Sequence, residues 1–298
     1  MIWLWTSVLS AALLGCYEIS KKQAVRSVGA MQVLLFSTLL STLFILPLLF
    51  LREVPSYSTA EHLILAGKSA LVMLSWICGI YAIKHLPLTT VGIVKASRPV
   101  FILLGCMLIF AERPNAVQLG GILLAIVALY LLGRSSRSEG ISFSGNRWVW
   151  CLFGSVLFGV CSALVDKYVM RDHDPLTVQV WCNVYITVML ALVMAVIALF
   201  RCRRTCAREA FGSIFAFRPQ LSLLLISVFL TVSDYLYFYS LSCEGSLLSV
   251  VSMLRRSSVI VTFLGGALLF KEGNLRAKAF EMALLLVAMA LLLFGSYL

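Results

Sequence analysis

Long apolar runs separated by short polar connections fill almost the whole chain. A helix needs roughly 20 predominantly apolar residues to cross a bilayer, and such windows lie near residues 2–20, 30–51, 63–83, 87–110, 116–133, 147–165, 176–200, 219–241, 246–270 and 275–297. Runs such as LLFSTLLSTLFILPLLFL lack the period-two alternation that is typical of membrane strands. The pattern therefore predicts an all-α membrane protein with ten transmembrane helices.

The connections between these windows are too short to form a further domain. The longest lie around residues 52–62, 134–146 and 201–218, whereas an independent soluble domain needs about 50 residues or more. The N-terminal run MIWLWTSVLSAALLGC has no basic region in front of it and nine further windows after it, so we interpret it as an uncleaved first helix. We therefore expect the function to lie within the membrane.

Composition agrees with this interpretation. The chain is 61% hydrophobic and 12% charged, while soluble proteins usually have about 25% charged residues. The net charge of +11 would suit nucleic acid, but the basic residues are scattered over short connections. The odd-numbered connections, together with the first four residues of the windows that follow them, hold fifteen Lys and Arg residues, and the even-numbered ones counted in the same way hold four. The positive-inside rule then places both termini outside the cytoplasm.

The sequence carries no pattern of an enzyme, a metal centre or a cofactor site. Nucleophile-elbow and phosphate-loop motifs are absent. The three histidines, His62, His85 and His173, fall at window ends or in connections, which argues against a histidine metal site within the membrane. We predict a protein that is not an enzyme and needs no cofactor.

Four strong cations interrupt two of the apolar windows. Lys95 and Arg98 lie within residues 87–110, and Arg255 and Arg256 lie within residues 246–270. A charge near the bilayer centre costs on the order of 3 kcal/mol, so four of them favour a water-filled, functional cavity that handles an anion. The alternative is that these side chains reach an interface or make structural ion pairs.

The spacing of the cations suits an oxyanion. Lys95 and Arg98 are three residues apart and share a helix face, whereas Arg255 and Arg256 point about 100° apart. Arginine offers a planar fork to phosphate or carboxylate oxygens, and lysine offers a mobile point charge. Asp234 is the one acid deep within a window. It could pair with an arginine or take up a proton to couple transport.

Aromatic residues near the matched positions of the two halves are candidates to contact the uncharged part of a substrate. Trp76 and Tyr235 are the preferred two. Trp76 occupies the position in the first half that corresponds to Asp234 in the second half, and Tyr235 is next to Asp234. The alternative for each is packing or a place at the membrane interface.

The two halves of the sequence resemble one another. An offset of 160 residues pairs Lys95 with Arg255, Gly105 with Gly265, Phe110 with Phe270 and Glu112 with Glu272. Upstream, an offset of 158 pairs Ser75 with Ser233, and near the start of each half an offset of 145 pairs Trp3 with Trp148 and Cys16 with Cys161. Five helices per copy is an odd number, so the second copy must be inverted. Inverted repeats place a shared site near the midplane and permit alternating access by rocking.

We therefore expect two inverted five-helix repeats. The first spans residues 1–134, a linker follows at 135–146, and the second spans residues 147–298. The Gly and Ser residues near 105, 265 and 266 are expected to allow close helix packing.

These doubled motifs resemble the drug/metabolite transporter superfamily, specifically its ten-helix EamA-type branch. The resemblance rests on the repeated small-residue helix, on Glu112 and Glu272 at the turn that follows it, and on the glycines of the final helix of each half, Gly120, Gly121, Gly133 and Gly295. It covers essentially the whole chain and implies export or exchange of a small metabolite. Members of this family are commonly drawn with both termini in the cytosol, opposite to the orientation that the charge count indicates.

The basic residues resemble a narrower group, the triose-phosphate/phosphate translocators. That group carries a Lys on the fourth helix and a basic pair on the ninth helix that hold phosphate, and Lys95 and Arg255–Arg256 stand at matching places. The resemblance implies an anionic, phosphorylated substrate. The small multidrug-resistance relatives instead exchange protons through a Glu on the first helix, where Glu18 lies beside Lys21 and Lys22.

The leading prediction is a secondary transporter of a small organic anion that works by alternating access. The alternatives are a proton-coupled exporter of amino acids, drugs or other metabolites, and a non-transporting membrane subunit or receptor. The expected partners are a small anionic molecule and the lipid bilayer, with no nucleic acid, and a homodimer is left open. We expect the protein to reside in a bacterial inner membrane.

Overall fold

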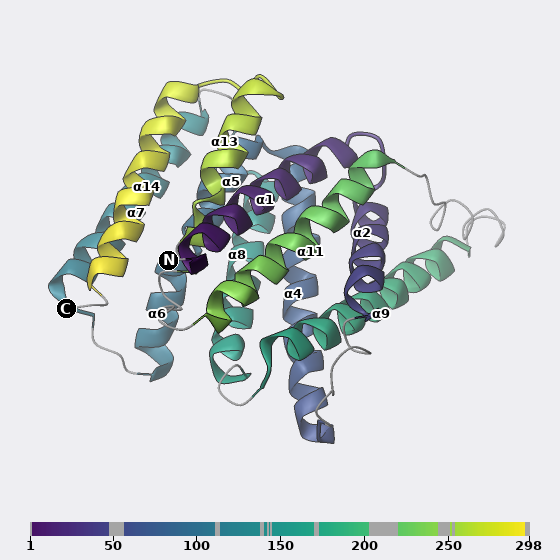
Figure 1. Ribbon diagram of the computed structural model, residues 1–298. Coiled ribbons are helices and arrows are strands. Elements are labelled where there is room, and N and C mark those ends of the chain that lie inside the picture. The colour runs from purple at the N-terminus through teal and green to yellow at the C-terminus, as the bar shows by residue number, and fades with distance from the viewer. Residues whose placement is uncertain are drawn as a thin grey trace.

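The computed structural model describes residues 2–47, 57–110, 114–137, 140–141, 143, 145–169, 173–202, 220–243, 251 and 254–295. In these ranges all regular elements are helices (Figure 1). Their bounds are α1 Ile2–Ala24, α2 Ala30–Ile45, α4 Thr59–His85, α5 Leu88–Ala96, α6 Arg98–Phe110, α7 Ala116–Arg137, α8 Arg147–Val169, α9 Pro175–Cys202, α11 Leu221–Ser242, α13 Ser258–Leu268 and α14 Leu275–Gly295. The predicted all-α fold is confirmed.

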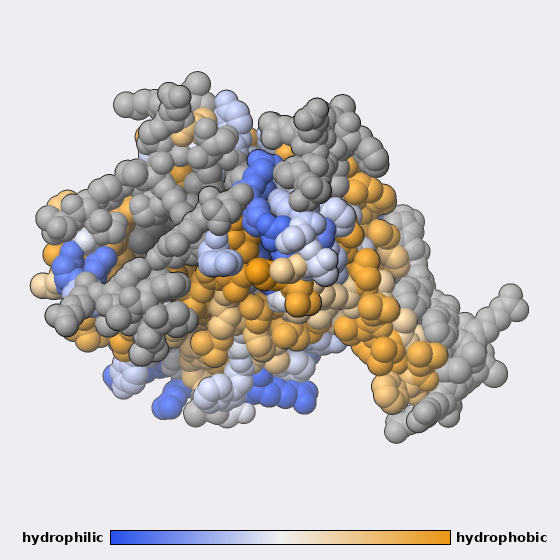
Figure 2. Space-filling view, turned by 90° about the horizontal axis from the view of Figure 1, so that it is seen from below, coloured by the Kyte–Doolittle hydropathy of each residue, from blue (hydrophilic) through white to orange (hydrophobic). Residues whose placement is uncertain are grey.

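Each of the ten predicted windows contains a described helix. Six of the spans are long and apolar enough to cross a membrane: Thr59–His85, Leu88–Gly105, Ala116–Arg137, Arg147–Asp166, Leu176–Phe200 and Leu275–Gly295. Ala30–Ile45 and Leu221–Tyr237 are apolar but shorter. Large apolar side chains on these helices face outward, as Leu123 and Phe200 do with exposed fractions of 65% and 66%. Figure 2 shows extensive apolar surface, with hydrophilic residues gathered in separate patches.

Helices from the two halves of the sequence pack against each other in matching pairs. In the first pair α1 lies along α11, as Figure 1 shows, and in the second α4 lies along α8. The helices α7 and α14, which end the two halves, lie side by side. The helix α13 packs against α1 and α5, and α6 packs against α8. The core therefore forms between the halves rather than inside each one.

Two reciprocal serine pairs hold the first two helix pairs together. The hydroxyl of Ser10 donates to the carbonyl of Ser233 at 2.7 Å, and the hydroxyl of Ser233 donates to the carbonyl of Ser10 at 2.8 Å. Between α4 and α8 the hydroxyls of Ser75 and Ser155 each donate to the other residue's carbonyl at 2.7 Å. The offsets found in the sequence, 145 and 158, relate Ser10 to Ser155 and Ser75 to Ser233. Equivalent residues therefore make equivalent contacts.

A break interrupts the same position of two equivalent segments. The predicted windows 87–110 and 246–270 read as continuous, but α5 ends at Ala96 and α6 begins after Ser97, while α13 begins after Ser257. The Ser97 hydroxyl donates to the carbonyl of Val94 at 2.7 Å, and the Ser257 hydroxyl donates to the carbonyl of Leu254 at 2.6 Å. Such back-bonding competes with the helical hydrogen bonds. The first break also has Pro99, whose nitrogen cannot donate and which fits the first turn of a new helix.

Glu272 fixes the start of α5. Its carboxylate accepts hydrogen bonds from the backbone nitrogens of Leu88 and Thr89 at 2.5 Å and 2.9 Å and from the Thr89 hydroxyl at 2.7 Å. These donors are among the first N–H groups of a helix, which have no partner within the helix itself. A residue of the second half thus positions the helix that carries Lys95. The equivalent Glu112 lies outside the described residues.

The expected close packing at a glycine is also observed. A Cβ atom placed on Gly265 would lie 2.4 Å from Cδ1 of Ile19, so only glycine lets α13 approach α1 this closely. This contact brings the segment that follows Arg255 against the helix that carries Glu18.

Candidate functional site

Lys95 makes an ion pair across the helix interface with Glu18 of α1. Its Nζ atom lies 2.9 Å and 3.0 Å from the two carboxylate oxygens of Glu18. The Nζ atom of Lys21 lies 3.9 Å from the same carboxylate. The side chains of Lys95 and Glu18 are 18% and 16% exposed, so this pair is buried but still within reach of water.

A second ion pair joins Arg255 to Asp234 of α11. The guanidinium contacts one carboxylate oxygen, Oδ1, and lies over the ring of Tyr237 at 4.4 Å. The other oxygen, Oδ2, accepts a hydrogen bond from the side-chain nitrogen of Gln179 at 3.4 Å. The side chains of Arg255 and Asp234 are 16% and 20% exposed. The two ion pairs are therefore buried to the same extent.

Arg98 lies beside the serine pair of α4 and α8. Its Nη2 atom is 3.4 Å from both the hydroxyl of Ser75 and the carbonyl of Ser155, which is a weak contact for a charged donor. The guanidinium rests on the backbone of Gly159, where an added Cβ atom would lie 2.5 Å from its Cζ atom. The Nε atom is buried and has no hydrogen-bond partner among the described residues. Arg98 therefore retains unused donor capacity.

Arg256 has no hydrogen bond or ion pair with any residue that the structure describes. Its electrostatic neighbours are Arg98 and Arg255, both of the same sign, and Tyr237. Tyr17 lies between the two ion pairs, within electrostatic range of Glu18, Asp234 and Arg255, and accepts a hydrogen bond from Lys21 at 3.1 Å. The structure thus brings together in one cluster all four cations that the sequence singled out.

This cluster, which we call the charge cluster, has a surplus of positive charge in the described chain. It contains five cations and two acids: Lys21, Lys95, Arg98, Arg255 and Arg256, with Glu18 and Asp234. Neutralising the surplus takes further negative charge. Arginine and lysine side chains bind phosphate and carboxylate well, so the cluster is suited to an oxyanion.

The two predicted aromatic residues lie at different places relative to the charge cluster. Trp76 of α4 is partly buried and packs against the core. Tyr235 is 49% exposed on α11, beside the acid but on an outward face. Tyr237, three residues from Asp234, contacts Arg255 instead. The sequence spacing could have favoured Tyr237 over Tyr235, because residues three apart share a helix face and adjacent residues do not.

Other members of the cluster were not singled out from the sequence as site residues. In the sequence Glu18 lies beside Lys21 and Lys22, but its shortest contact is to Lys95. Lys22 instead donates to the carbonyls of Ile83 and Leu86 at the end of α4, at 2.6 Å and 2.5 Å. Gln179 carried a weak signal, since it is a polar residue in an apolar helix.

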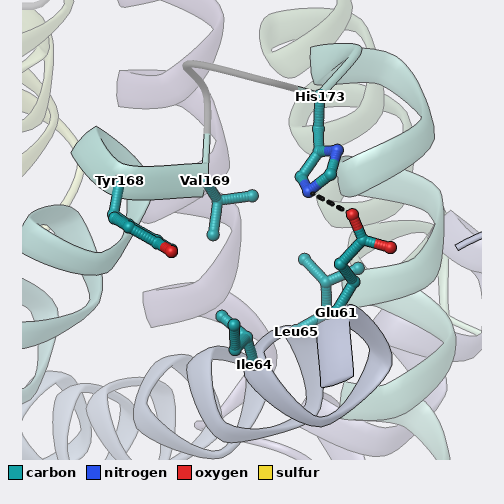
Figure 3. Close-up of a pocket in the computed structure, with 6 residues that line it drawn as sticks. All are labelled: Glu61, Ile64, Leu65, Tyr168, Val169 and His173. Atoms are coloured by element: carbon teal, nitrogen blue, oxygen red, sulfur yellow. Dashed lines mark ion pairs between the residues drawn. The ribbon is translucent and has the colours of Figure 1, made fainter. Parts of the chain in front are cut away.

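Separate polar contacts lie at the starts of α4 and α11. A pocket beside α4 is lined by Glu61, Ile64, Leu65, Tyr168, Val169 and His173. In Figure 3 the His173 ring points toward Glu61, with its Nε2 atom 3.3 Å from a carboxylate oxygen. At the start of α11 a second pocket includes Ser27 and Gln220, whose side chains form a hydrogen bond of 3.0 Å. In the described part of the chain no group of three possible metal ligands occurs.

Comparisons with known proteins give a consistent picture of the fold. Residues 1–134 match the model of the EamA-like transporter family. A relative from Pseudomonas aeruginosa, "Uncharacterized transporter PA0485", is 30% identical over 121 residues, which cover 39% of this chain and 40% of that protein. A solved structure described as "Crystal structure of protein" superposes with a TM-score of 0.63 at 16% identity, covering 97% of this chain and 94% of that one.

The family match and the bacterial relative support the predicted resemblance to EamA-type transporters, the family match over residues 1–134. The chain is a multi-pass integral membrane protein, and the bacterial relative fits an inner membrane. The matched family and the bacterial relative are both named as transporters, and neither is named as an enzyme. The solved structure supports the fold alone. The narrower resemblance to the phosphate translocators stays a prediction.

Proposed function

We propose that the protein is a secondary transporter that moves a small organic anion across the membrane by alternating access. The surplus of cations in the charge cluster is the observation that carries this proposal. Charged residues within membrane segments are costly and mark substrate pathways. An oxyanion bound among the cations would offset this cost, which would explain why so many positive charges lie together within the membrane segments.

The two acids act as internal counter-ions while the site is empty. Glu18 and Asp234 hold Lys95 and Arg255, and an incoming oxyanion takes their place on the same donors. Arg255 offers a planar fork for two oxygens and Lys95 offers a point charge. Arg98 and Arg256 have donors left over in the described structure, so they recognise the parts of the anion that the paired cations do not reach.

Alternating access follows from two inverted repeats, residues 1–134 and 147–298. The equivalent serine pairs and the equivalent breaks at Ser97 and Ser257 support this internal symmetry. In many transporters the substrate lies where interrupted helices of the two repeats meet near the midplane. Lys95 and Arg255 each stand two residues before a break. We infer that the breaks bring both cations to a shared site.

A second candidate function is proton-coupled export of amino acids, drugs or other small metabolites. One observation favours it: Glu18 is a membrane-embedded acid on the first helix with a cross-helix partner, Lys95. Protonation of Glu18 would release Lys95, which is the kind of exchange such a mechanism needs. The surplus positive charge favours the anion.

Thermal unfolding of the purified protein tests the substrate class. Phosphate, phosphosugars, carboxylates and quaternary amines are compared, because a ligand that binds only the folded state raises the unfolding temperature. We expect stabilisation by an oxyanion, lost in Arg255→Ala and weakened in Lys95→Ala. Arg134→Ala, an exposed arginine at the end of α7, serves as the matched control.

Stabilisation by quaternary amines alone, unchanged in Arg255→Ala and Lys95→Ala, would overturn the anion proposal. Uptake into proteoliposomes then separates the two mechanisms. An anion exchanger needs a counter-substrate inside the vesicle, whereas the proton-coupled alternative needs a pH gradient.

A further inference from the structure

Gln179 of α9 has a buried acceptor without a partner next to the charge cluster. Its side chain is 7% exposed, and its Oε1 atom has no hydrogen-bond partner within the described structure. Its Nε2 atom donates to Oδ2 of Asp234 at 3.4 Å. A carboxylate only accepts hydrogen bonds, so the amide nitrogen is the atom that contacts Asp234, and the amide oxygen, bonded to the same carbon, lies beside it. The orientation of the amide is thereby fixed by chemistry.

A buried acceptor without a donor is unfavourable and rare. The cations beside it are already engaged or repel one another, since Arg255 is bound to Asp234 and Arg256 has Arg98 and Arg255 as its electrostatic neighbours. A simple oxyanion would not satisfy the acceptor, because its oxygens also accept. A substrate with its own hydroxyl or ammonium donor would.

Binding of an anion adds a second acceptor at the same place. When an oxyanion engages Arg255, the Oδ1 atom of Asp234 loses its partner. The site then presents two acceptors from neighbouring helices, Oδ1 of Asp234 on α11 and Oε1 of Gln179 on α9. Two acceptors beside a cluster of cations recognise a molecule with both an anionic group and a donor group.

We propose that Gln179 is a specificity-determining residue, and that with Asp234 it selects organic anions that also carry a hydrogen-bond donor. This inference rests on the proposed function, since it assumes that the anion binds at Arg255. The class includes hydroxylated anions, such as polyol phosphates and hydroxy acids, and anions that carry an ammonium group. It leaves out simple alkyl phosphates and unsubstituted carboxylates.

Paired ligands that differ only in the donor test the proposal by isothermal titration of the purified full-length protein. Glycerol phosphate is compared with propyl phosphate, lactate with propionate, and phosphoethanolamine with ethyl phosphate. We expect each ligand with a donor to bind about tenfold more tightly than its partner, the gain of one hydrogen bond. A preference for the hydroxyl pair or for the ammonium pair tells which donor the site takes.

The variant Gln179→Met keeps the side-chain volume but removes both polar atoms. We expect it to lose the preference for the ligand with a donor, measured as the ratio of the two affinities within each pair, because loss of the amide nitrogen beside Asp234 acts on both members of a pair alike. Gln220→Met, at the start of α11, is the control, since that glutamine contacts Ser27 and not the charge cluster. It should keep the preference of the natural chain.

If the natural chain binds both members of every pair with equal affinity, the proposed role of Gln179 is wrong. This measurement does not depend on whether the variant folds. The proposed function survives that result provided that Arg255→Ala abolishes binding of the ligands without a donor. Binding of none of the six ligands overturns both proposals. A preference that remains unchanged in Gln179→Met overturns the assignment to this residue.

Discussion

The two halves of the molecule agree in their ion-paired cations and in their serines but differ in their acids. Lys95 and Arg255 occupy equivalent positions, each two residues before an equivalent break. Their partners are not equivalent, because Glu18 lies on the first helix of one half and Asp234 on the third helix of the other. These two helices, α1 and α11, pack against each other, so both acids reach the cluster from one helix pair.

The difference in the acids suggests that the cations and the acids have separate roles, binding the anion and neutralising the empty site. Under the proposed mechanism, an anion must meet the same donors whichever side of the membrane the site faces, which symmetric cations provide. The acids act only when the site is empty, so no symmetry constrains them. Their surroundings differ accordingly: Glu18 has Lys21 nearby as a second cation, whereas Asp234 has the neutral amide of Gln179.

The largest expected effect is an unequal loss of stability when either paired cation is removed. Arg255→Met leaves Asp234 as a buried carboxylate without a charged partner, which costs about 3–5 kcal/mol. Lys95→Met should cost roughly half as much, because Lys21 remains 3.9 Å from Glu18. Denaturant unfolding of the purified protein, followed by circular dichroism, measures both.

The double variant Asp234→Asn/Arg255→Met is the matched control for this comparison. It removes both charges together and should recover most of the lost stability. Equal losses in the two single variants would show that Lys21 does not compensate Glu18, and the contrast between the halves would fail.

An intermediate effect should be equal in the two halves. Ser10→Ala and Ser155→Ala each remove one hydroxyl from a reciprocal serine pair, at a cost of about 1 kcal/mol per hydrogen bond. The two losses should agree, because the two pairs have the same distances to within 0.1 Å. Ser20→Ala is the control, since the Ser20 hydroxyl bonds only within its own helix. Losses that differ severalfold in the same unfolding assay would contradict the internal symmetry.

The smallest expected effect concerns the contacts at the starts of α4 and α11. The side chains of His173 and Glu61 are 18% and 34% exposed. Exposed ion pairs contribute about 0–1 kcal/mol. His173→Gln should therefore lower the free energy of unfolding by less than about 1 kcal/mol. Gln220→Ala, which removes the exposed contact with Ser27, should have a similarly small effect. The same denaturant unfolding assay measures both variants.

A loss in either variant that exceeds the loss measured for the serine variants would contradict this ranking. The contacts at the helix starts would then stabilise the protein more than a hydrogen bond between the two halves does.

The positions of the helices and the identity of the cations could be predicted from the sequence, because apolar length and intramembrane charge are local signals. The breaks at Ser97 and Ser257 could not, since averaging over a window hides one turn, and only the first has a nearby proline. The pairing of Glu18 with Lys95 was also hidden, because the residues are 77 positions apart and only helix packing joins them. Gln179 lies near Asp234 for the same reason.

The reciprocal serine pairs have a mechanical consequence for the proposed transport cycle. Each pair fastens a helix of one half to a helix of the other, α1 to α11 and α4 to α8. If residues of one half moved as a rigid body relative to the other half, these four buried hydrogen bonds would have to break. Under the proposed mechanism, the parts that move as rigid bodies would therefore be these mixed pairs of helices, and the protein would open along the boundary between them.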